Sequence, residues 1–258
     1  MCFRLNLKAY ICQNFLMHKS VKPYKNSEDQ KKHQVRTMFD NISSNYDGLN
    51  RVISFGIDQS WRKKVIKMVT DSHAKSVIDI ATGTGDLAIA LAKTETEKIV
   101  GIDISNGMLD VGRQKIKNQN LSDKIDMVQA DSENLPYDDN SFDAATVACG
   151  VRNFEDLDKG LSEIYRVLKP DGVFVVLETS NPTKFPFKQG YTIYTKYILP
   201  LIGKLFSKDK SAYRYLSESA SVFPFGEAFN NILKKNGFIN VKDLPQTFGV
   251  STIYKASK

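Results

Sequence analysis

The chain has 258 residues, of which 41% are hydrophobic and 25% charged, an ordinary balance for a globular protein with a substantial core. Its three cysteines lack the spacing of a disulfide framework or a zinc site, so we expect a reducing, cytoplasmic environment and no bound metal. Residues 1–36 carry a net charge of +6 out of +7 for the whole chain, which excludes an extended basic face. No nucleic-acid partner is therefore expected.

The amino-terminal residues 1–34 are predicted to form a basic, flexible tail, and residues 35–258 a single domain. The tail suits either a solvated segment or attraction to anionic lipid, and its sequence alone leaves both alternatives open. Its first apolar stretch is too short, and too interrupted by Arg4 and Lys8, for a signal peptide.

The domain is predicted to begin with two helices and to continue with alternating strands and helices. The first helix starts near Val35 and the second at Asp58. Strands are expected at 76–81, 98–103, 125–131, 142–150 and 173–179, with helices at 87–93, 105–118 and 157–168 between them. Strands rich in Val and Ile that alternate with amphipathic helices favour a parallel, doubly wound α/β sheet. A last helix (227–236) and two strands (239–244 and 249–256) complete the chain.

The segment from about residue 185 to 225 differs in character, because ten of its 41 residues are aromatic. Helical spacing of Tyr191, Tyr194, Ile198 and Leu205 predicts helices with an apolar face. A packed helical pair explains this pattern. A helical lid over a hydrophobic substrate explains it equally well, since the segment follows the end of a strand, where such folds bind ligands.

A glycine-rich turn lies in "VIDIATGTGDLAIALA", residues 77–92, between a predicted strand and a helix. Gly83, Gly85 and Ala88 match the dinucleotide fingerprint, with Asp103 twenty residues after the first glycine, so an NAD-dependent dehydrogenase is one interpretation. However, Asp86 would repel a pyrophosphate at the start of the helix. S-adenosylmethionine has no phosphate, and its ammonium and sulfonium groups suit Asp79 and Asp86.

Two further aspartates end the next two predicted strands. Asp103 can accept both ribose hydroxyls, in either an NAD or an S-adenosylmethionine site. Asp131 can accept from the adenine amino group, and the backbone of Ser132 can meet the ring. We therefore expect these residues to bind S-adenosylmethionine: Asp79, Gly83, Thr84, Gly85, Asp86, Asp103, Asp131 and Ser132.

Several longer motifs resemble the menaquinone/ubiquinone biosynthesis C-methyltransferase family. They include "YDGLNRVISFGIDQSWR", "ADSENLPYDDNSFDAATVACGVRNFED" and "AYRYLSES", and the resemblance covers about residues 35–258. It implies a class I S-adenosylmethionine-dependent methyltransferase fold, a Rossmann-like sheet with amino-terminal helices and a helical lid. In that family Thr84, Asp103 and the pair Asp131-Ser132 correspond to cofactor contacts. Ala148-Cys149 departs from the Ser-Phe of some members, which puts a serine contact at position 148 in doubt.

The same resemblance implies C-methylation of a polyprenylated quinol, such as demethylmenaquinol. A benzoquinol of ubiquinone biosynthesis is the alternative substrate, and a non-catalytic protein whose lid binds a lipid is another interpretation. Peripheral contact with the inner face of the membrane and a homo-oligomer are further expectations. The quoted motifs define neither the membrane contact nor the oligomeric state.

Methylation of a ring carbon needs stabilisation of the quinol oxyanion and removal of a ring proton. No histidine is available, because His18, His33 and His73 fall outside the predicted site. Arg152 and Asn153, which follow the fourth strand, and Tyr46 and Asp47 from the amino-terminal helices are therefore the predicted catalytic residues. Arg152 has the alternative of an ion pair with Glu155 or Asp156, and "NYDG" that of a turn.

Overall fold

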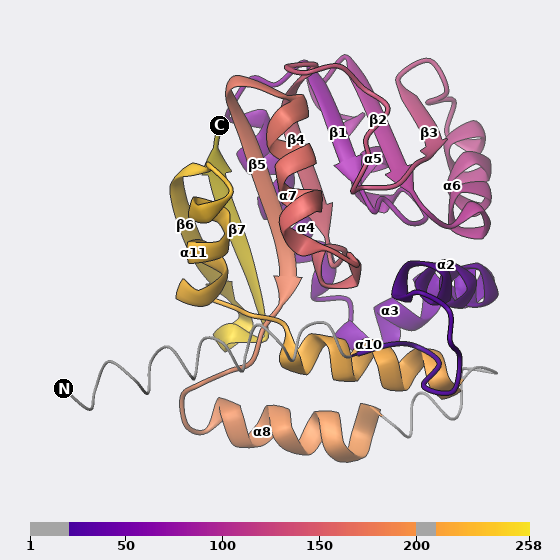
Figure 1. Cartoon of the computed structure of the whole chain (residues 1–258), viewed down its shortest axis with the longest axis vertical. Helices are drawn as coiled ribbons and strands as arrows, with labels where there is room; N and C mark the ends of the chain where they lie inside the picture. Colours follow the sequence, from indigo (N-terminus) through magenta and orange to yellow (C-terminus); the bar gives the residue numbers. More distant parts are fainter. Residues whose placement is uncertain (1–20, 200–209) are drawn as a thin grey trace.

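A seven-stranded sheet with the order β3-β2-β1-β4-β5-β7-β6 forms the centre of the computed structural model, which describes residues 21–199 and 210–258 (Figure 1). Its strands are β1 (Ser76–Ile80), β2 (Lys98–Asp103), β3 (Ile125–Gln129), β4 (Phe142–Ala148), β5 (Leu168–Thr179), β6 (Ile239–Gln246) and β7 (Ser251–Ser257). The first five are parallel, as predicted. β7 is antiparallel to both β5 and β6, so the sheet as a whole is mixed.

Helices cover both faces of the sheet, since each strand presents apolar side chains alternately to the two sides. Ile78 of β1 and Phe174 of β5 share one apolar cluster with α7 (Leu157–Val167) and α11 (Glu227–Lys235). Val77 and Val175 share the opposite cluster with α4 (Asp58–Thr70), α5 (Asp86–Leu91) and α6 (Asn106–Asn118). The result is the three-layer α/β/α architecture that the alternating sequence pattern predicts.

The remaining helices lie beyond the carboxyl ends of the parallel strands, at the bottom of Figure 1. They are α2 (Lys31–Ile42), α3 (Tyr46–Ser54), α8 (Phe187–Ile193), the π-turn η3 (Tyr194–Ile198) and α10 (Lys210–Val222). Short 3₁₀ turns occur at η1 (Ser43–Asn45), η2 (Val151–Asn153) and η4 (Thr247–Gly249). An apolar cluster that includes Met38 of α2, Met108 of α6 and Tyr215 of α10 joins α2 and α10 to the helix layer that contains α6.

Two sequence-based expectations need correction. The packed part of the chain begins before residue 35, because α2 starts at Lys31 and the side chains of Lys31 and Gln34 are buried. Most of the predicted tail, residues 1–20, lies outside the described residues. "NYDG" is not a turn, since Tyr46 starts α3 and Asp47 lies in the first turn of that helix. Within residues 21–199 and 210–258, no helix has the length and apolar character needed to cross a membrane.

Candidate active site

Two adjoining pockets open at the carboxyl ends of the parallel strands and share Tyr46, Ala81, Gly83 and Ala148. The first pocket is lined by the predicted residues Asp103, Asp131, Ser132 and Asn153. The second is lined by Asp47, Asp79, Thr84 and Asp86. The structure thus brings every predicted site residue to the lining of these two pockets except Gly85 and Arg152, which line neither.

The glycine turn gives the cavity its shape. Gly83 and Gly85 have φ values of 58° and 77°, in the left-handed region that residues other than glycine rarely adopt. A Cβ atom built on Gly83 would meet nothing within 4 Å, so the backbone there faces open space. The turn is held because Thr82 donates its N–H to the Ile102 carbonyl, at 2.9 Å. A ligand can therefore approach the backbone of Gly83 closely.

Asp103, the last residue of β2, holds its carboxylate against this turn. One oxygen accepts from the Gly83 N–H and the other from the Ser105 N–H, both at 2.9 Å. Burial raises the pKa of Asp103 to about 6, although the backbone hydrogen bonds partly oppose this shift. Each oxygen keeps a second lone pair, so the carboxylate can accept two hydroxyl groups of a ribose in the first pocket.

Asp79 lies deeper than we expected. Its two oxygens accept hydrogen bonds from the hydroxyls of Thr82 and Thr146, both at 2.6 Å, and burial raises its pKa. The carboxylate therefore supports the floor of the second pocket and fixes Thr82. Its charge can still attract a ligand cation through space, but the residue is only 1% exposed, so direct contact would require local movement.

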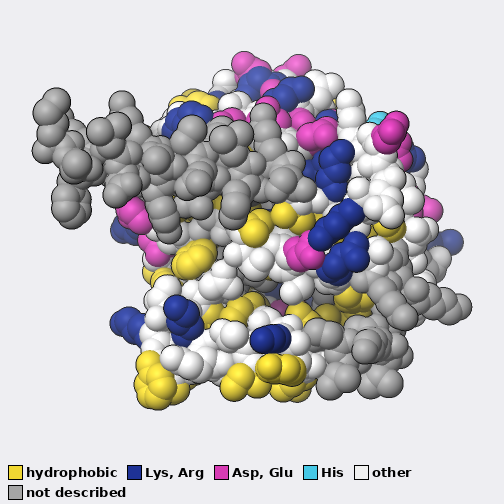
Figure 2. All heavy atoms as spheres, turned by 60° about the horizontal axis from the view of Figure 1, so that its bottom comes forward, with side chains coloured by type: hydrophobic (Ala, Val, Ile, Leu, Met, Phe, Trp, Pro, Cys, Tyr) yellow, Lys and Arg dark blue, Asp and Glu magenta, His cyan; other side chains and the backbone are white. Residues whose placement is uncertain are grey.

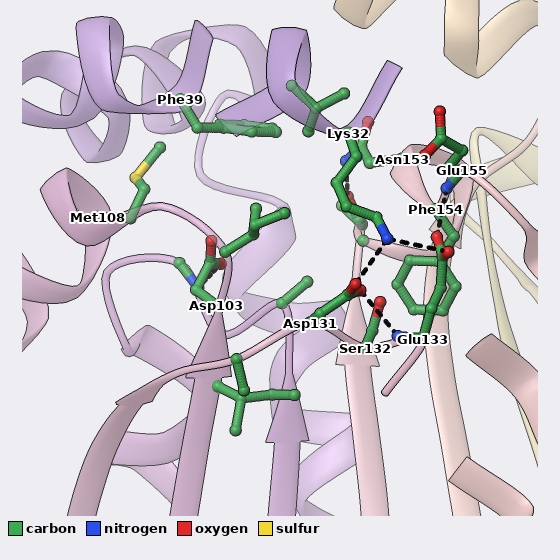
Figure 3. A pocket seen from close by; sticks show the side chains of 18 of the residues that line it. Lys32, Phe39, Asp103, Met108, Asp131, Ser132, Glu133, Asn153, Phe154 and Glu155 are labelled. Atoms are coloured by element: carbon green, nitrogen blue, oxygen red, sulfur yellow. Dashed lines mark hydrogen bonds and ion pairs between the residues drawn. The ribbon is translucent and has the colours of Figure 1, made fainter. Parts of the chain in front are cut away.

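Asp131 and Ser132 follow β3 and face Asp103 across the first pocket, as Figure 3 shows. Lys32, on α2, pairs with Asp131 at 2.6 Å and with Glu133 at 3.2 Å. Its neighbour Lys31 is buried and donates to the carbonyl of Phe154 at 2.7 Å, and burial lowers the pKa of Lys31 to about 8. The two lysines, which we had not predicted as site residues, fasten α2 over the pocket.

A cationic centre at Lys115, on α6, organises the second pocket. Its ammonium pairs with Asp86 and, at 2.9 Å, with Asp47. Thr84 donates its hydroxyl to Asp47 at 2.6 Å, which ties α3 to the glycine turn. Asp86 and Asp47 are therefore already partly neutralised. Sequence reasoning missed Lys115 because nothing in the helix sequence 106–118 shows which ridge faces α3.

Arg62, on α4, also lines the second pocket and was not predicted. Its Nε atom is buried and makes no hydrogen bond, and its one ion pair among the described residues joins this atom to Asp58 at 3.5 Å. Burial acts to lower the pKa of Arg62, but the carboxyl, thiol and phenol groups around it outweigh burial and raise that pKa. A fully charged guanidinium with spare donors faces the pocket, an arrangement suited to an anion.

Arg152 lies behind the first pocket and is nearly inaccessible, with 7% of its surface exposed. It pairs with the buried Glu178 at the end of β5 and donates to the Cys149 carbonyl at 2.9 Å. The alternative partners considered from the sequence, Glu155 and Asp156, are therefore wrong. Arg152 Nε and the second oxygen of Glu178 are both buried without a hydrogen bond.

The other predicted catalytic residues line the pockets. Asn153 lines the first pocket, and its carbonyl oxygen accepts from the Tyr215 hydroxyl of α10 at 3.1 Å. Tyr46 lines both pockets and packs edge-on against Phe39, and burial raises its pKa. Cys149 has φ 57° and adds its side chain to the wall of the first pocket.

Comparisons with known proteins agree with this geometry. The ubiE/COQ5 methyltransferase family matches residues 25–258 of the chain. A demethylmenaquinone methyltransferase of Bacteroides fragilis is 50% identical over 239 residues, which is 92% of this chain and 97% of the relative. A ubiquinone/menaquinone biosynthesis C-methyltransferase of Geobacter sulfurreducens is 42% identical over 231 residues, 89% of this chain and 90% of the relative.

Solved structures show the same fold at low sequence identity. An S-adenosylmethionine-dependent methyltransferase of Thermotoga maritima, described as a possible histamine N-methyltransferase, has a TM-score of 0.58 at 19% identity and covers 86% of this chain and 99% of its own. The [4+2]-cyclase SpnF has a TM-score of 0.61 at 18% identity, with coverage of 87% and 95%. The fold is that of class I methyltransferases, and the family match over residues 25–258 decides against the dehydrogenase interpretation. The chain belongs to the ubiE/COQ5 methyltransferase family.

Proposed function

We propose that the protein transfers a methyl group from S-adenosylmethionine to a ring carbon of a polyprenylated quinol, with demethylmenaquinol as substrate and menaquinol as product. The similarity over nearly the whole chain to demethylmenaquinone methyltransferases carries the choice of substrate. The paired pockets support it, since one offers carboxylates to an adenosine and the other offers the ligand's carboxylate the guanidinium of Arg62, whose Nε makes no hydrogen bond.

The residues of the two pockets fit S-adenosylmethionine with its adenosine in the first pocket and its methionine end in the second. Asp103 would hold the ribose hydroxyls, Asp131 the adenine amino group, and Ser132 the adenine ring through its backbone. Arg62 would bind the carboxylate of the methionine end, and the negative field of Asp79 and Asp86 would favour its ammonium. When bound, the cofactor supplies an electrophilic methyl group.

The quinol ring is proposed to lie against Asn153, Cys149 and Tyr46, beside the position of the sulfonium. Arg152, which lines neither pocket, would stabilise the developing quinol oxyanion through its charge or through an ordered water bound at its buried Nε. Methyl transfer would form a carbon–carbon bond as the methyl–sulfur bond breaks and its electron pair stays with the departing S-adenosylhomocysteine, and it would leave a proton on the same ring carbon. That proton must leave to restore aromaticity, and the candidate acceptors are Tyr46, which lines both pockets, and Asp47, which lines the second.

The segment at about 185–225 is proposed to cover the polyprenyl chain. Its described parts, α8, η3 and α10, lie at the same end of the sheet as the pockets, and residues 200–209 fall outside the described residues (Figure 1). Burial of apolar surface at about 25 cal/mol per Å² makes each prenyl unit a large contributor to binding. We therefore expect a higher kcat/KM for prenylated quinols than for the bare ring, and equal values would contradict the lid.

The deciding experiment supplies the purified chain with methyl-labelled S-adenosylmethionine and either demethylmenaquinol or the corresponding benzoquinol. Mass spectrometry of the extracted quinones should show the label on menaquinol, and the Asp103→Ala variant should lose most of the product because it binds the cofactor poorly. Label on the benzoquinol alone would shift the proposal to ubiquinone biosynthesis. The function would be overturned if a folded, cofactor-binding protein gave no labelled quinone.

We further propose that the protein is a cytoplasmic enzyme that works at the inner face of the membrane.

A further inference from the structure

A group of exposed apolar side chains lies at the same end of the molecule as the pockets. It comes from the α3–α4 junction, from the segment around α8, and from η4. Three of its phenylalanines, Phe55, Phe185 and Phe248, are 72%, 79% and 67% exposed. We call this group the apolar face and define it by Phe55, Ile57, Phe185, Ile193, Tyr197 and Phe248.

Direct contacts make the apolar face one continuous surface rather than scattered residues. The ring of Phe55 lies 6.1 Å from the ring of Tyr194, whose hydroxyl donates to the Ile53 carbonyl at 2.6 Å. At the other side, Phe187 stacks on Phe248 with ring centroids 3.8 Å apart. The α3–α4 junction, α8 with η3, and η4 are thus bound side by side. Single exposed apolar residues need no explanation, but a connected set of this size indicates an interaction surface.

The charges of the segment around α8 have one sign. Residues 183–199 contain three lysines, Lys184, Lys188 and Lys196, all exposed, and no acidic residue. Figure 2, which turns this end of the molecule forward, shows hydrophobic side chains and separate Lys or Arg side chains along the lower edge of the view. Interfaces between proteins are depleted of lysine in their cores, whereas aromatic side chains interleaved with lysine are typical of surfaces that rest on anionic lipid.

We propose that the apolar face docks on a lipid bilayer that contains anionic headgroups. This inference rests on the proposed function, because a polyprenylated quinol resides in the bilayer. It places the lipid contact on a surface of the folded domain, whereas the sequence suggested the basic residues 1–36. The aromatic rings would enter the interface, and the lysines would lie at the level of the headgroups.

The position of α3 shows how such docking would serve the site. Asp47, in its first turn, lines the second pocket, and Phe55 follows its last residue. Phe55 comes eight positions after Asp47, which corresponds to a rise of about 12 Å along the helix. A quinol ring could therefore enter the cavity while its prenyl chain still runs toward the membrane. Docking at this end requires no further movement of the substrate out of the bilayer.

Flotation of the full chain with vesicles tests this surface independently of methyl transfer. We expect the protein to float with vesicles of phosphatidylethanolamine and phosphatidylglycerol, and much less with vesicles of phosphatidylcholine alone. Phe55→Ser and Phe248→Ser should each reduce the bound fraction several-fold, and Lys188→Glu by about fivefold or more. Matched controls lie at the opposite end of the sheet: Ile239→Ser, at a residue 54% exposed, and Lys93→Glu should float like the wild type.

Turnover measurements separate this inference from the proposed function. Phe55→Ser should methylate a short-chain quinol in solution at the wild-type rate and lose rate only with prenylated quinol in vesicles. The docking surface is wrong if the wild type fails to float, if the Phe55 and Phe248 variants float like the wild type, or if charge makes no difference. It is also wrong if light scattering shows a dimer that these substitutions dissociate, since a second copy would then cover the face. Absence of methylation with normal flotation would instead overturn only the function.

Discussion

Arg152 pairs with Glu178, across the ends of β4 and β5, rather than with an acidic residue near it in the sequence. Both side chains are buried, and each keeps one polar atom without a hydrogen bond. Buried polar atoms without partners are uncommon, because each costs about 1–3 kcal/mol. The pair can therefore bind one more polar group. In the proposed reaction this group is an ordered water beside the quinol oxygen.

The contribution of this buried pair to the free energy of unfolding can be tested by removing one partner or both. Arg152→Met leaves the Glu178 charge buried and alone, and we expect it to lower the free energy of unfolding by about 3–5 kcal/mol. The double variant Arg152→Met/Glu178→Met should lose clearly less. Chemical denaturation measures both. Lys235→Met, which removes an exposed ion pair with Asp158, is the control and should cost at most about 1 kcal/mol. Equal losses for the single and double variants would show that the unpaired Glu178 charge is not what destabilises Arg152→Met.

Arg152→Lys tests the role of the guanidinium in catalysis while it retains a cation beside Glu178. Lysine offers a compact charge without the planar fork of donors, so part of the oxyanion stabilisation should be lost. We expect a single-turnover methylation rate about tenfold or more below the wild type, with unchanged affinity for S-adenosylmethionine. Rapid-quench measurements give the rate and calorimetry the affinity. A wild-type rate in the folded variant would reduce Arg152 to a structural residue.

Asp103 should make cofactor binding depend on pH. Burial raises its pKa to about 6, and only the ionised carboxylate can accept both ribose hydroxyls. The affinity for S-adenosylmethionine is therefore expected to be full above the pKa and to fall as the pH drops through about 6. Calorimetry on either side of that pH measures the change. Asp103→Asn should bind weakly at every pH, with a flat profile, whereas an unchanged pH dependence would assign the titration to another group.

The sequence predicts the sheet and its ligand edge well, because both depend on local patterns. Alternating apolar strands and helices define the five parallel strands, and aspartates that end strands must meet at one edge, as Asp103 and Asp131 do. The direction of β7 did not follow from the pattern. The sequence 249–256 identifies a strand, but its antiparallel pairing with β5 depends on a long-range contact.

The charged partners within the site were not predictable in the same way. Lys32 meets Asp131 from 99 residues away, and Lys115 meets Asp47 from 68 residues away, so neither pair leaves a spacing to detect. The expected ion pair of Arg152 failed for this reason, since proximity in sequence favoured Glu155 and Asp156 whereas the fold brings in Glu178. Helix faces and cross-sheet contacts decide these pairs, and they exist only once the layers have packed.

Arg62 offers the sharpest test of where the methionine end of the cofactor binds. Its buried Nε has no hydrogen-bond partner, and its guanidinium faces the second pocket, where a carboxylate would satisfy it. A charge-assisted pair of this kind contributes about 1.5–3 kcal/mol, so Arg62→Met should weaken S-adenosylmethionine binding by about 10–100-fold. Decarboxylated S-adenosylmethionine lacks the group in question. The wild type should bind it weakly, and Arg62→Met should bind the two compounds almost equally.

Arg51→Met, at an exposed residue of the same pocket, is the control and should keep the wild-type preference. If Arg62→Met still discriminates between the two compounds, the carboxylate binds elsewhere and the proposed direction of the cofactor in the cavity is wrong.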